Sequence, residues 1–373
     1  MAVEIKEVKT KKDIGQFVKV QFDIYEGNKY WVPPMIKDER KSLDPEKNPA
    51  YDFCDAKFFL AYKNEECVGR IGAVINHSYN EKVGKKLGRI NRFEFIDDFD
   101  VSSALMEKAI SWLKEKGMKT VHGPLGFTNL DTQGLLVEGF DYLQSVGSVY
   151  HHAYYKDHFE KMGFEKERDW IEFRLTLTDR PVKKAARGAE LIKKRYGYEV
   201  VRFRDKKEML SYSKLIFGVL NDAFQDLPYV TRFDDKMVDY YTKKYFNVLD
   251  PRYVIVVKDG EEIIAFVIAM PSLSEAMQKA KGKLFPFGFL HLLKAMKHPR
   301  VIETLLTGVL HEYQAKGVAV ILYAELQAEM LKKGLVTIET TGIFEDNHAA
   351  IGNWKNYENI QHKRRRCFVK NID

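Results

Sequence analysis

The stretch Gln314-Ala315-Lys316-Gly317-Val318-Ala319 decides our interpretation of this chain. It follows an apolar run, residues 301–310, that is typical of a buried strand, and it precedes a helical pattern that Gly334 ends. A glycine turn that leads into a helix leaves the first N–H groups of the helix unpaired and pointing outward. Gly317 has no Cβ to hinder a close approach, and residues 318–322 contain no acidic side chain. The stretch therefore predicts a site for a diphosphate, to which Lys316 adds a mobile positive charge.

Strands and helices alternate around this turn, and the order of the second half repeats that of the first. The expected first-half elements are a strand at 3–8, a helix at 13–25, strands at 58–62, 67–75 and 87–95, a helix that Ser102 or Ser103 caps, a strand near Val121, a helix at 154–162 and a strand at 170–177. The expected second-half elements are a strand at 199–203, helices at 206–224 and 235–246, a hairpin of 253–257 with 263–270, the strand and helix around the glycine turn, a strand at 336–341, a helix at 348–356 and a strand at 363–369.

This repeat predicts two domains, residues 1–178 and 198–373, joined by a polar helix at 179–197. The predicted fold class is α/β (α+β layered), and each domain is a mixed, mainly antiparallel sheet flanked by helices.

The order of elements resembles that of the GNAT superfamily of acyl-CoA-dependent N-acyltransferases. The family's pyrophosphate signature is Gln or Arg, two residues, Gly, one residue, then Gly or Ala, and Gln314, Gly317 and Ala319 match it between a strand and a helix. Asn347 resembles the Asn that opens the family's next helix. The resemblance covers both halves in element order, but its motifs cover only the part from about residue 300 onward. It implies acetyl-CoA, or another acyl-CoA, as co-substrate of the second domain. The turn at residues 314–319 is alternatively no more than a tight connection between strand and helix.

The equivalent turn of the first half differs in charge. Asp97, Asp98 and Asp100 precede its helix, and three carboxylates at a helix start repel a pyrophosphate. We therefore expect the first domain to keep the GNAT-like fold without binding CoA.

Acyl transfer to an amine needs a group that accepts the amine proton, because an ammonium is not a nucleophile. Glu303 and Glu339, on the strands that flank the thioester, are the candidate bases, and Glu345 is a further one; each is alternatively a solvated polar position. The N–H groups of Val309 and Leu310 are candidates to polarise the thioester carbonyl. Many family members place a Tyr seven residues after the Asn to protonate the leaving thiolate, but this chain has Trp354 there, which cannot donate a proton in this way. Tyr357 is the candidate substitute, although a thiolate can also leave without an acid.

The glycine-rich loop at 123–134 is long for a simple connection. It and its flank carry Asn129, Asp131, Gln133 and Glu138, which we expect to bind an acceptor amine if the loop roofs the acceptor pocket. The alternative is a surface loop packed on itself.

Composition limits the class of protein. With 45% hydrophobic and 30% charged residues, no run of transmembrane length and no signal-like start, we expect a cytoplasmic globular protein. Its three cysteines are spaced for neither zinc nor pairing, and His151, His152 and His158 lack an acidic partner pattern, so we expect no metal. The net charge of +7 is spread along the chain, so stable nucleic-acid binding is not expected. The apolar stretch 284–294 has basic flanks that suit a membrane surface, but a lid or core helix is the commoner structure.

The sequence thus predicts an N-acetyltransferase that transfers an acetyl group to a primary amine of a small molecule or peptide by direct attack. Two alternatives remain: a non-catalytic acyl-CoA sensor, and a Fem-type transferase that takes its acyl group from aminoacyl-tRNA.

Overall fold

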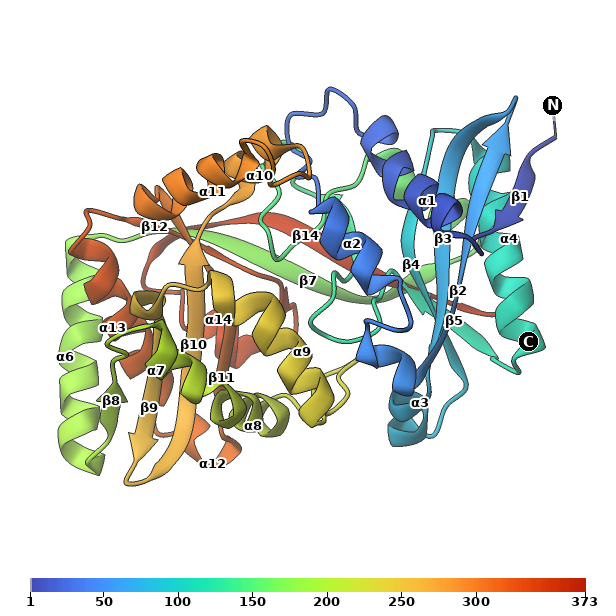
Figure 1. Cartoon of the computed structure of the whole chain (residues 1–373). Coiled ribbons are helices and arrows are strands. Elements are labelled where there is room, and N and C mark those ends of the chain that lie inside the picture. Colours follow the sequence, from blue (N-terminus) through green and yellow to red (C-terminus); the bar gives the residue numbers. More distant parts are fainter. Residues whose placement is uncertain (1) are drawn as a thin grey trace. The chain divides into compact units, whose positions relative to one another are not determined.

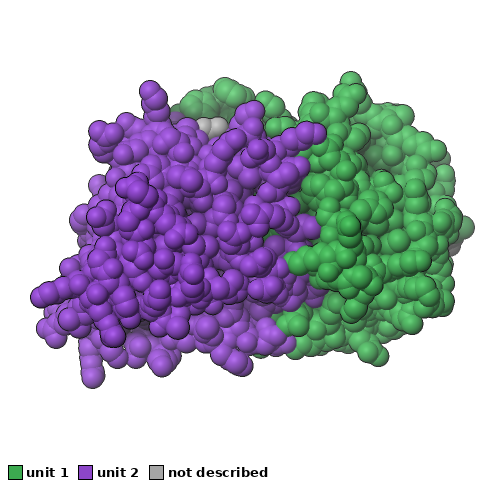
Figure 2. All heavy atoms as spheres, turned by 90° about the horizontal axis from the view of Figure 1, so that it is seen from below, with its two compact units in different colours: residues 1–170, 274–292, 363–373 green, residues 171–273, 293–362 purple. Residues whose placement is uncertain are grey.

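The protein is described from a computed structural model that covers residues 2–373, apart from the side chain of Asn247. The chain forms two compact units, which Figure 2 distinguishes by colour. Unit 1 contains residues 1–170, 274–292 and 363–373, and unit 2 contains residues 171–273 and 293–362. The compact units therefore do not coincide with the two halves of the sequence.

Unit 1 is built on a sheet with the strand order β1-β2-β3-β4-β5-β14, in which β4 and β5 are parallel and the other neighbouring pairs are antiparallel. Helices α1 and α4 lie on opposite faces, since Phe58 contacts Phe17 of α1 whereas its neighbour Phe59 belongs to the core under α4. The elements are β1 (Glu4–Glu7), α1 (Lys11–Ile24), α2 (Ile36–Ser42), β2 (Cys54–Lys63), β3 (Glu66–Asn76), α3 (His77–Val83), β4 (Leu87–Phe95), α4 (Phe99–Glu115), β5 (Thr120–Gly123), β6 (Leu135–Glu138), α5 (Tyr154–Lys161) and α10 (Ser274–Ala280) (Figure 1).

Unit 2 is built on a sheet with the order β7-β12-β11-β10-β9-β8, in which β11 and β12 are parallel. Its elements are α6 (Asp179–Tyr196), β8 (Glu199–Val201), α7 (Lys206–Ser211), α8 (Ser213–Ala223), α9 (Asp235–Tyr245), β9 (Val254–Asp259), β10 (Glu262–Pro271), β11 (Val301–Val309), α12 (His311–Gln314), α13 (Val318–Leu331), β12 (Thr337–Thr340), β13 (Ile343–Phe344) and α14 (His348–Gly352). Strand β7 (Glu165–Thr176), strand β14 (Glu358–Asn371) and helix α11 (Gly288–Lys297) each contain residues of both units.

Each half of the sequence contributes a strand to the other unit. The end of β14, at Phe368–Asn371, pairs with β5 of unit 1, whereas Arg174 and Thr176 of β7 pair with β12 of unit 2. Sequence periodicity places both strands correctly along the chain but carries no information about which neighbour each one pairs with.

Helix α13 is apolar on most of its circumference, with Glu325, Gln327 and Glu329 as its polar residues, and its packing explains why. Ile321, Leu322 and Leu326 are fully buried in the core that α13 shares with the sheet and with α6. A helix that is apolar on most sides is stable only when it is covered on several of them. Helix α6 therefore forms a second layer outside α13, and α8 contacts strands β10 and β11 on the other face of the sheet.

The predicted fold class is confirmed, with corrections to single elements. Helix α4 starts at Phe99 rather than after Ser102, because the carboxylate of Asp98 accepts the N–H of Asp100 and caps the helix. The expected helix at 206–224 is two helices that meet at Tyr212. No helix within residues 2–373 has both the length and the apolar character needed to cross a bilayer.

Candidate active site

The glycine turn has the local conformation that the sequence predicts. Gly317 has φ +77°, in the left-handed region, and stands directly before the first residue of α13. The N–H groups of Val318 and Ala319 lie at the positive end of the helix dipole, because these residues begin α13. The first turn of α13 contains no acidic residue that would repel an anion. A Cβ at Gly317 would lie 2.9 Å from Cδ1 of Ile192 in α6. The left-handed backbone thus favours glycine whether or not a ligand binds, and a side chain there would also displace the end of Ile192.

The residues before Gly317 organise the turn. The side-chain amide of Gln314 donates to the carbonyl of Val309 at 3.2 Å and so links the turn to the end of β11. The ammonium of Lys316 lies 4.3 Å from the ring centre of Tyr313. Ala315 is exposed between them. The turn therefore has a cationic side chain directly before Gly317 and the first residues of α13, which suits an anion.

Strands β11 and β12 separate beside this turn. They pair only from Val301 to Thr304 on β11, where Leu305 forms a bulge against β10. Thr341 then bonds back to the carbonyls of Thr304 and Leu305, at 3.1 and 3.0 Å. Beyond Thr304, β11 therefore has β10 on one edge and no strand on the other within the described residues.

The pairing of β11 with β10 determines which N–H groups of β11 point toward the open edge. The N–H of Leu310 donates to the carbonyl of Ile264 in β10 at 3.0 Å, so it is not available as the predicted oxyanion donor. Because bonded and non-bonded residues alternate in an antiparallel pair, the N–H groups of Val309 and Thr307 point to the open edge. Val309 and Thr307 are therefore the candidate donors, and Leu310 is not. The sequence did not indicate Thr307, because the direction of each N–H depends on the register of β11 against β10.

The two predicted carboxylates lie together in the sheet. Glu303 and Glu339 are register neighbours on parallel strands, and both point away from the core that contains Ile302 and Ile338. Glu303 is 1% exposed and Glu339 is 6% exposed. Neither is a solvated surface position, so that alternative is wrong for both. Glu345, the third candidate, lies after β13 and is half-buried.

Three further polar residues surround Glu339 on this face. Arg174 of β7 donates to its carboxylate through Nε at 2.7 Å and through Nη2. His362 has Nε2 3.9 Å from Oε2 of Glu339, and its Nδ1 lies 3.1 Å from the carbonyl of Glu172. The sequence did not indicate Arg174, His362 or Glu172, because β7 and β14 join this sheet from distant parts of the chain. Both carboxylates are buried candidate bases, and Glu303 lies on β11, the strand with the open edge.

Two aromatic residues occupy the region where a proton donor is expected. Trp354 is 3% exposed and packs edge-on against Tyr323 with ring centres 4.5 Å apart, while its indole N–H has no hydrogen-bond partner among the described residues. The hydroxyl of Tyr323 lies 3.0 Å from Oγ1 of Thr307 on the open strand. Tyr357, the donor named from the sequence, instead exchanges hydrogen bonds with the amide of buried Gln327. Asn347 caps α14 by accepting the N–H of Ala350 at 3.0 Å, as its motif implies.

The geometry favours Tyr323 over Tyr357 as the acid, and two substitutions test this. Burial raises the pKa of Tyr323 to about 12, so the phenol keeps its proton throughout the neutral range. We expect Tyr323→Phe to lower kcat by roughly 10- to 100-fold, because a positioned proton donor is lost. Tyr357→Phe, the matched control, should leave kcat within about twofold. The rate of thiol release, measured for both variants, shows which tyrosine is the acid. A larger loss of kcat in Tyr357→Phe than in Tyr323→Phe would contradict the assignment of Tyr323.

In unit 1, the edge between β4 and β5 corresponds to the open edge of β11, and it is covered. The N–H of Leu125 donates to the carbonyl of Ile90 in β4 at 2.7 Å, and Leu125 is fully buried. The guanidinium of Arg89 donates to the carbonyls of Gly126 and Phe127. The loop thus fills the edge between β4 and β5, and Asp98 already occupies the start of α4. Both features would hinder a diphosphate at this place, and a first domain that does not bind CoA stays a prediction.

The predicted acceptor residues belong to this loop or follow it. Asp131 accepts the N–H of Thr128 at 3.1 Å and holds the loop together. Gln133 bonds to the carbonyl of Thr128, and Glu138 forms an exposed ion pair with Arg364 at 3.2 Å. The side-chain oxygen of Asn129 is buried without a hydrogen-bond partner. The self-packed loop accounts for Asp131 and Gln133, and an acceptor role for the four residues stays a prediction.

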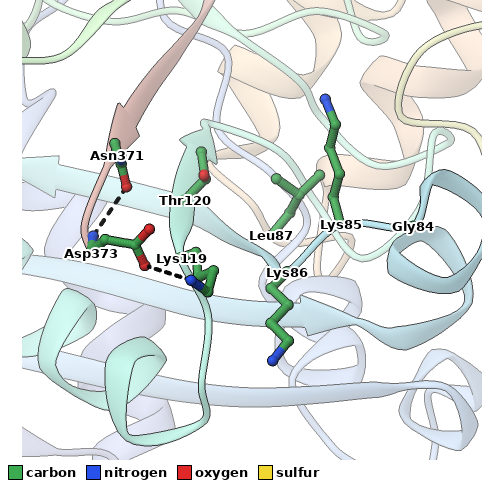
Figure 3. Close-up of a pocket in the computed structure, with 8 residues that line it drawn as sticks. All are labelled: Gly84, Lys85, Lys86, Leu87, Lys119, Thr120, Asn371 and Asp373. Carbon is green, nitrogen blue, oxygen red and sulfur yellow. Dashed lines mark hydrogen bonds and ion pairs between the residues drawn. The ribbon is translucent and has the colours of Figure 1, made fainter.

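Two other polar sites lie in unit 1. An open pocket of about 430 Å³ is lined by Lys85, Lys86, Lys119 and Asp373, and Lys119 pairs with Asp373 (Figure 3). Its lysine side chains extend into solvent, so it lacks the enclosure that a substrate site needs. His122, Glu167 and Cys367 have potential ligand atoms within 4.8 Å of one another. Burial lowers the pKa of His122, and the neighbouring guanidinium of Arg89 lowers it further with a positive charge that opposes a cation.

The comparisons with known proteins address the same region of unit 2. Residues 219–357, which contain β11, the glycine turn, Trp354 and Tyr357, match the Acetyltransferase (GNAT) family. The match is limited to these residues, and the whole chain has the tandem GNAT fold. A tandem GNAT protein from the clavulanic acid biosynthesis pathway superposes with a TM-score of 0.55 at 12% identity, over 99% of this chain and 98% of its own.

Two relatives match over most of the chain. Protein YghO of Escherichia coli (strain K12) is 26% identical over 97% of this chain and 94% of its own length. The bacterial ceramide synthase of Caulobacter vibrioides (strain NA1000 / CB15N) is 26% identical over 78% of this chain and 75% of its own length.

Proposed function

We propose that the chain is an acyl-CoA-dependent N-acyltransferase whose second half binds the acyl-CoA and transfers the acyl group to an amine by direct attack. The observation that carries the proposal is the open edge of β11 beside the first turn of α13. The open edge of β11 and the start of α13 belong to one connected segment, residues 307–319. One extended ligand with a diphosphate at one end and a carbonyl at the other fits such a segment.

The residues present fit an acyl-CoA at each part of this segment. Val318, Ala319 and Lys316 offer two amides and a cation to the diphosphate, and no carboxylate lies in the first turn of α13. Val309 and Thr307 offer two N–H groups to the thioester carbonyl, whose oxygen becomes more negative in the transition state. A bound acyl-CoA supplies the activated acyl group.

The remaining steps concern protons. The attacking amine must lose a proton, and Glu303 is a buried carboxylate on β11, the strand with the open edge. It lies one residue before the place where the strands separate. The phenol of Tyr323 donates a proton to the departing sulfur, and the unpaired indole N–H of Trp354 donates a hydrogen bond in the same region. Glu303 thus takes a proton from the amine, and Tyr323 gives a proton to the departing sulfur.

The acyl length and the acceptor are the finer part of the proposal. The GNAT resemblance implies acetyl-CoA, with a small-molecule or peptide amine as acceptor. The relative named bacterial ceramide synthase favours a fatty acyl-CoA and a long-chain amine, because a ceramide is a fatty amide. We therefore propose a long-chain donor as the second candidate for the same site and the same chemistry.

Thermal unfolding with four ligands tests the class of donor. A ligand at one hundred times its Kd stabilises the protein by about 2.7 kcal/mol, which raises Tm by several degrees. We expect acetyl-CoA or palmitoyl-CoA, and CoA itself, to raise Tm and tRNA to leave it unchanged. Stabilisation by tRNA alone would favour the Fem-type alternative and contradict the proposal.

Release of free thiol separates an enzyme from a sensor. We expect thiol release to depend on both the stabilising acyl-CoA and an added amine, with spermidine, a lysine peptide and sphinganine as the first panel. Binding of acyl-CoA with no thiol release from any amine would favour the non-catalytic sensor.

A further inference from the structure

We infer that helix α11 and the turn before it form a binding surface for an anionic lipid bilayer. The inference rests on the exposed apolar side chains, the charges around them and the way the segment is held. We refer to residues 279–300 as the basic-apolar segment. In Figure 1 it is the orange region at α10 and α11.

The apolar side chains of this segment face solvent, although they were expected to form a lid or a core helix. Phe285 is 77% exposed and Phe287 is 68% exposed. Leu284, Phe289, Leu290 and Leu293 are between 37% and 57% exposed. Large apolar residues that gather on a surface in this way mark an interaction site. Within α11 the exposed positions are 289, 290, 293, 294 and 297, which lie on one helical face.

The charges of the segment have one sign. Six basic residues lie between positions 279 and 300, and the nearest acidic residues in sequence are Glu275 and Glu303. All six are exposed, and none forms an ion pair with another residue in the range 2–373: they are Lys279, Lys281, Lys283, Lys294, Lys297 and Arg300. A surface with this charge is complementary to anionic lipid headgroups, and a helix of this composition lies in the interface of a bilayer.

The base of the segment is anchored to unit 1. The side-chain amide of Gln278 donates to the carbonyls of Lys29 and Trp31, both at 2.9 Å. The carbonyl of Gly282 accepts the N–H of Ile36 at 3.0 Å. Buried Gly288 leaves no room for a side chain, since a Cβ there would lie 1.9 Å from the carbonyl of Lys283. The phenylalanines are thus presented from a fixed turn.

Charge and aromatic composition together favour a bilayer over a second copy of this chain. An apolar dimer interface is depleted of lysine, whereas this surface is surrounded by unpaired lysines. A bilayer accepts both features at once, because apolar side chains enter the acyl boundary while lysines contact the headgroups.

Vesicle co-sedimentation of the full chain tests the inference. The vesicles are phosphatidylcholine alone, and phosphatidylcholine in which about a third of the lipid is phosphatidylglycerol. We expect binding to the anionic vesicles, and at least about tenfold weaker binding to the neutral ones or in about 1 M salt, where charges are screened.

Two variants and one control remove the features separately. Phe285→Ser/Phe287→Ser and Lys281→Glu/Lys283→Glu should each weaken binding to anionic vesicles by about tenfold or more. Leu191→Ser/Leu215→Ser removes two other exposed apolar residues, 70% and 55% exposed, and should leave binding unchanged. Thermal unfolding of all three should match the parent, because the substituted side chains are exposed.

Three results would overturn the inference. The first is parent-like vesicle binding in both variants, and the second is no vesicle binding by the parent. The third is a dimer, seen by sedimentation velocity, that Phe285→Ser/Phe287→Ser dissociates while the parent ignores vesicles; the segment would then be an interface between copies of this chain.

Discussion

Replacing Glu303 by Gln should lower kcat by about 10²- to 10⁴-fold while the Kd for CoA changes less than about twofold. The side chain is 1% exposed and lies where β11 and β12 begin to separate, so the amide fills the same space but cannot accept a proton. If the carboxylate takes the proton of the amine, raising the pH restores part of the rate, because more of the amine is then already neutral. Thiol release measured from pH 7 to about 10 checks both expectations.

Two substitutions serve as controls for Glu303. Glu261→Gln changes an exposed carboxylate in the turn between β9 and β10 and should have no effect. Glu339→Gln weakens the contact with Arg174, so it should lower Tm as well as the rate. Arg174 is 37% exposed on its side chain, which limits the loss of stability. If Glu339→Gln lowered the rate more than Glu303→Gln did, and Tm were unchanged in both variants, then Glu339 rather than Glu303 would be the base.

Reversing the charge of Lys316 should weaken CoA binding by roughly 5- to 30-fold, which corresponds to about 1 to 2 kcal/mol. The new carboxylate would lie within one residue of Gly317, at the start of α13, where it stabilises the helix but repels a diphosphate. Lys316→Gln, which only removes the positive charge, should have the smaller effect. Calorimetric titration with CoA measures both variants against the parent.

A matched control lies at the other end of the same helix. Lys333→Glu makes the same change of charge beyond the C-terminus of α13, roughly 20 Å from Gly317. It should leave the Kd unchanged in moderate salt, where charges this far apart are screened. Equal weakening by Lys316→Glu and Lys333→Glu would show that only the overall charge matters, and the site at Gly317 would then be wrong.

Local features of the fold could be predicted because they depend on neighbouring residues. The left-handed Gly317, the cap by Asn347 and the strand from Val301 follow from turn chemistry and from apolar runs. The strand exchange could not be predicted, since β7 and β14 look alike to any analysis of periodicity. The start of α4 shows a different limit of the sequence. Asp98 caps the helix, four residues before Ser102. Asp and Ser are equally good caps by residue type, so the sequence alone does not choose between them.

The candidate site divides in the same way. Glu303, Glu339 and Val309 could be found because they lie near the glycine turn in sequence. Thr307 could be chosen over Leu310 only after the ladder with β10 was known, and Tyr323 only after its hydroxyl was placed beside Thr307. Arg174 and His362 come from strands more than one hundred residues apart, so no local pattern links them to Glu339.

The central claim is that CoA binds at the start of α13 and along the open edge of β11. A crystal structure of the CoA complex tests it most directly. We expect the diphosphate within hydrogen-bond distance of the N–H groups of Val318 and Ala319, with the sulfur end directed along β11 toward Thr307. A CoA bound in unit 1, or in unit 2 away from residues 307–319, would contradict the claim.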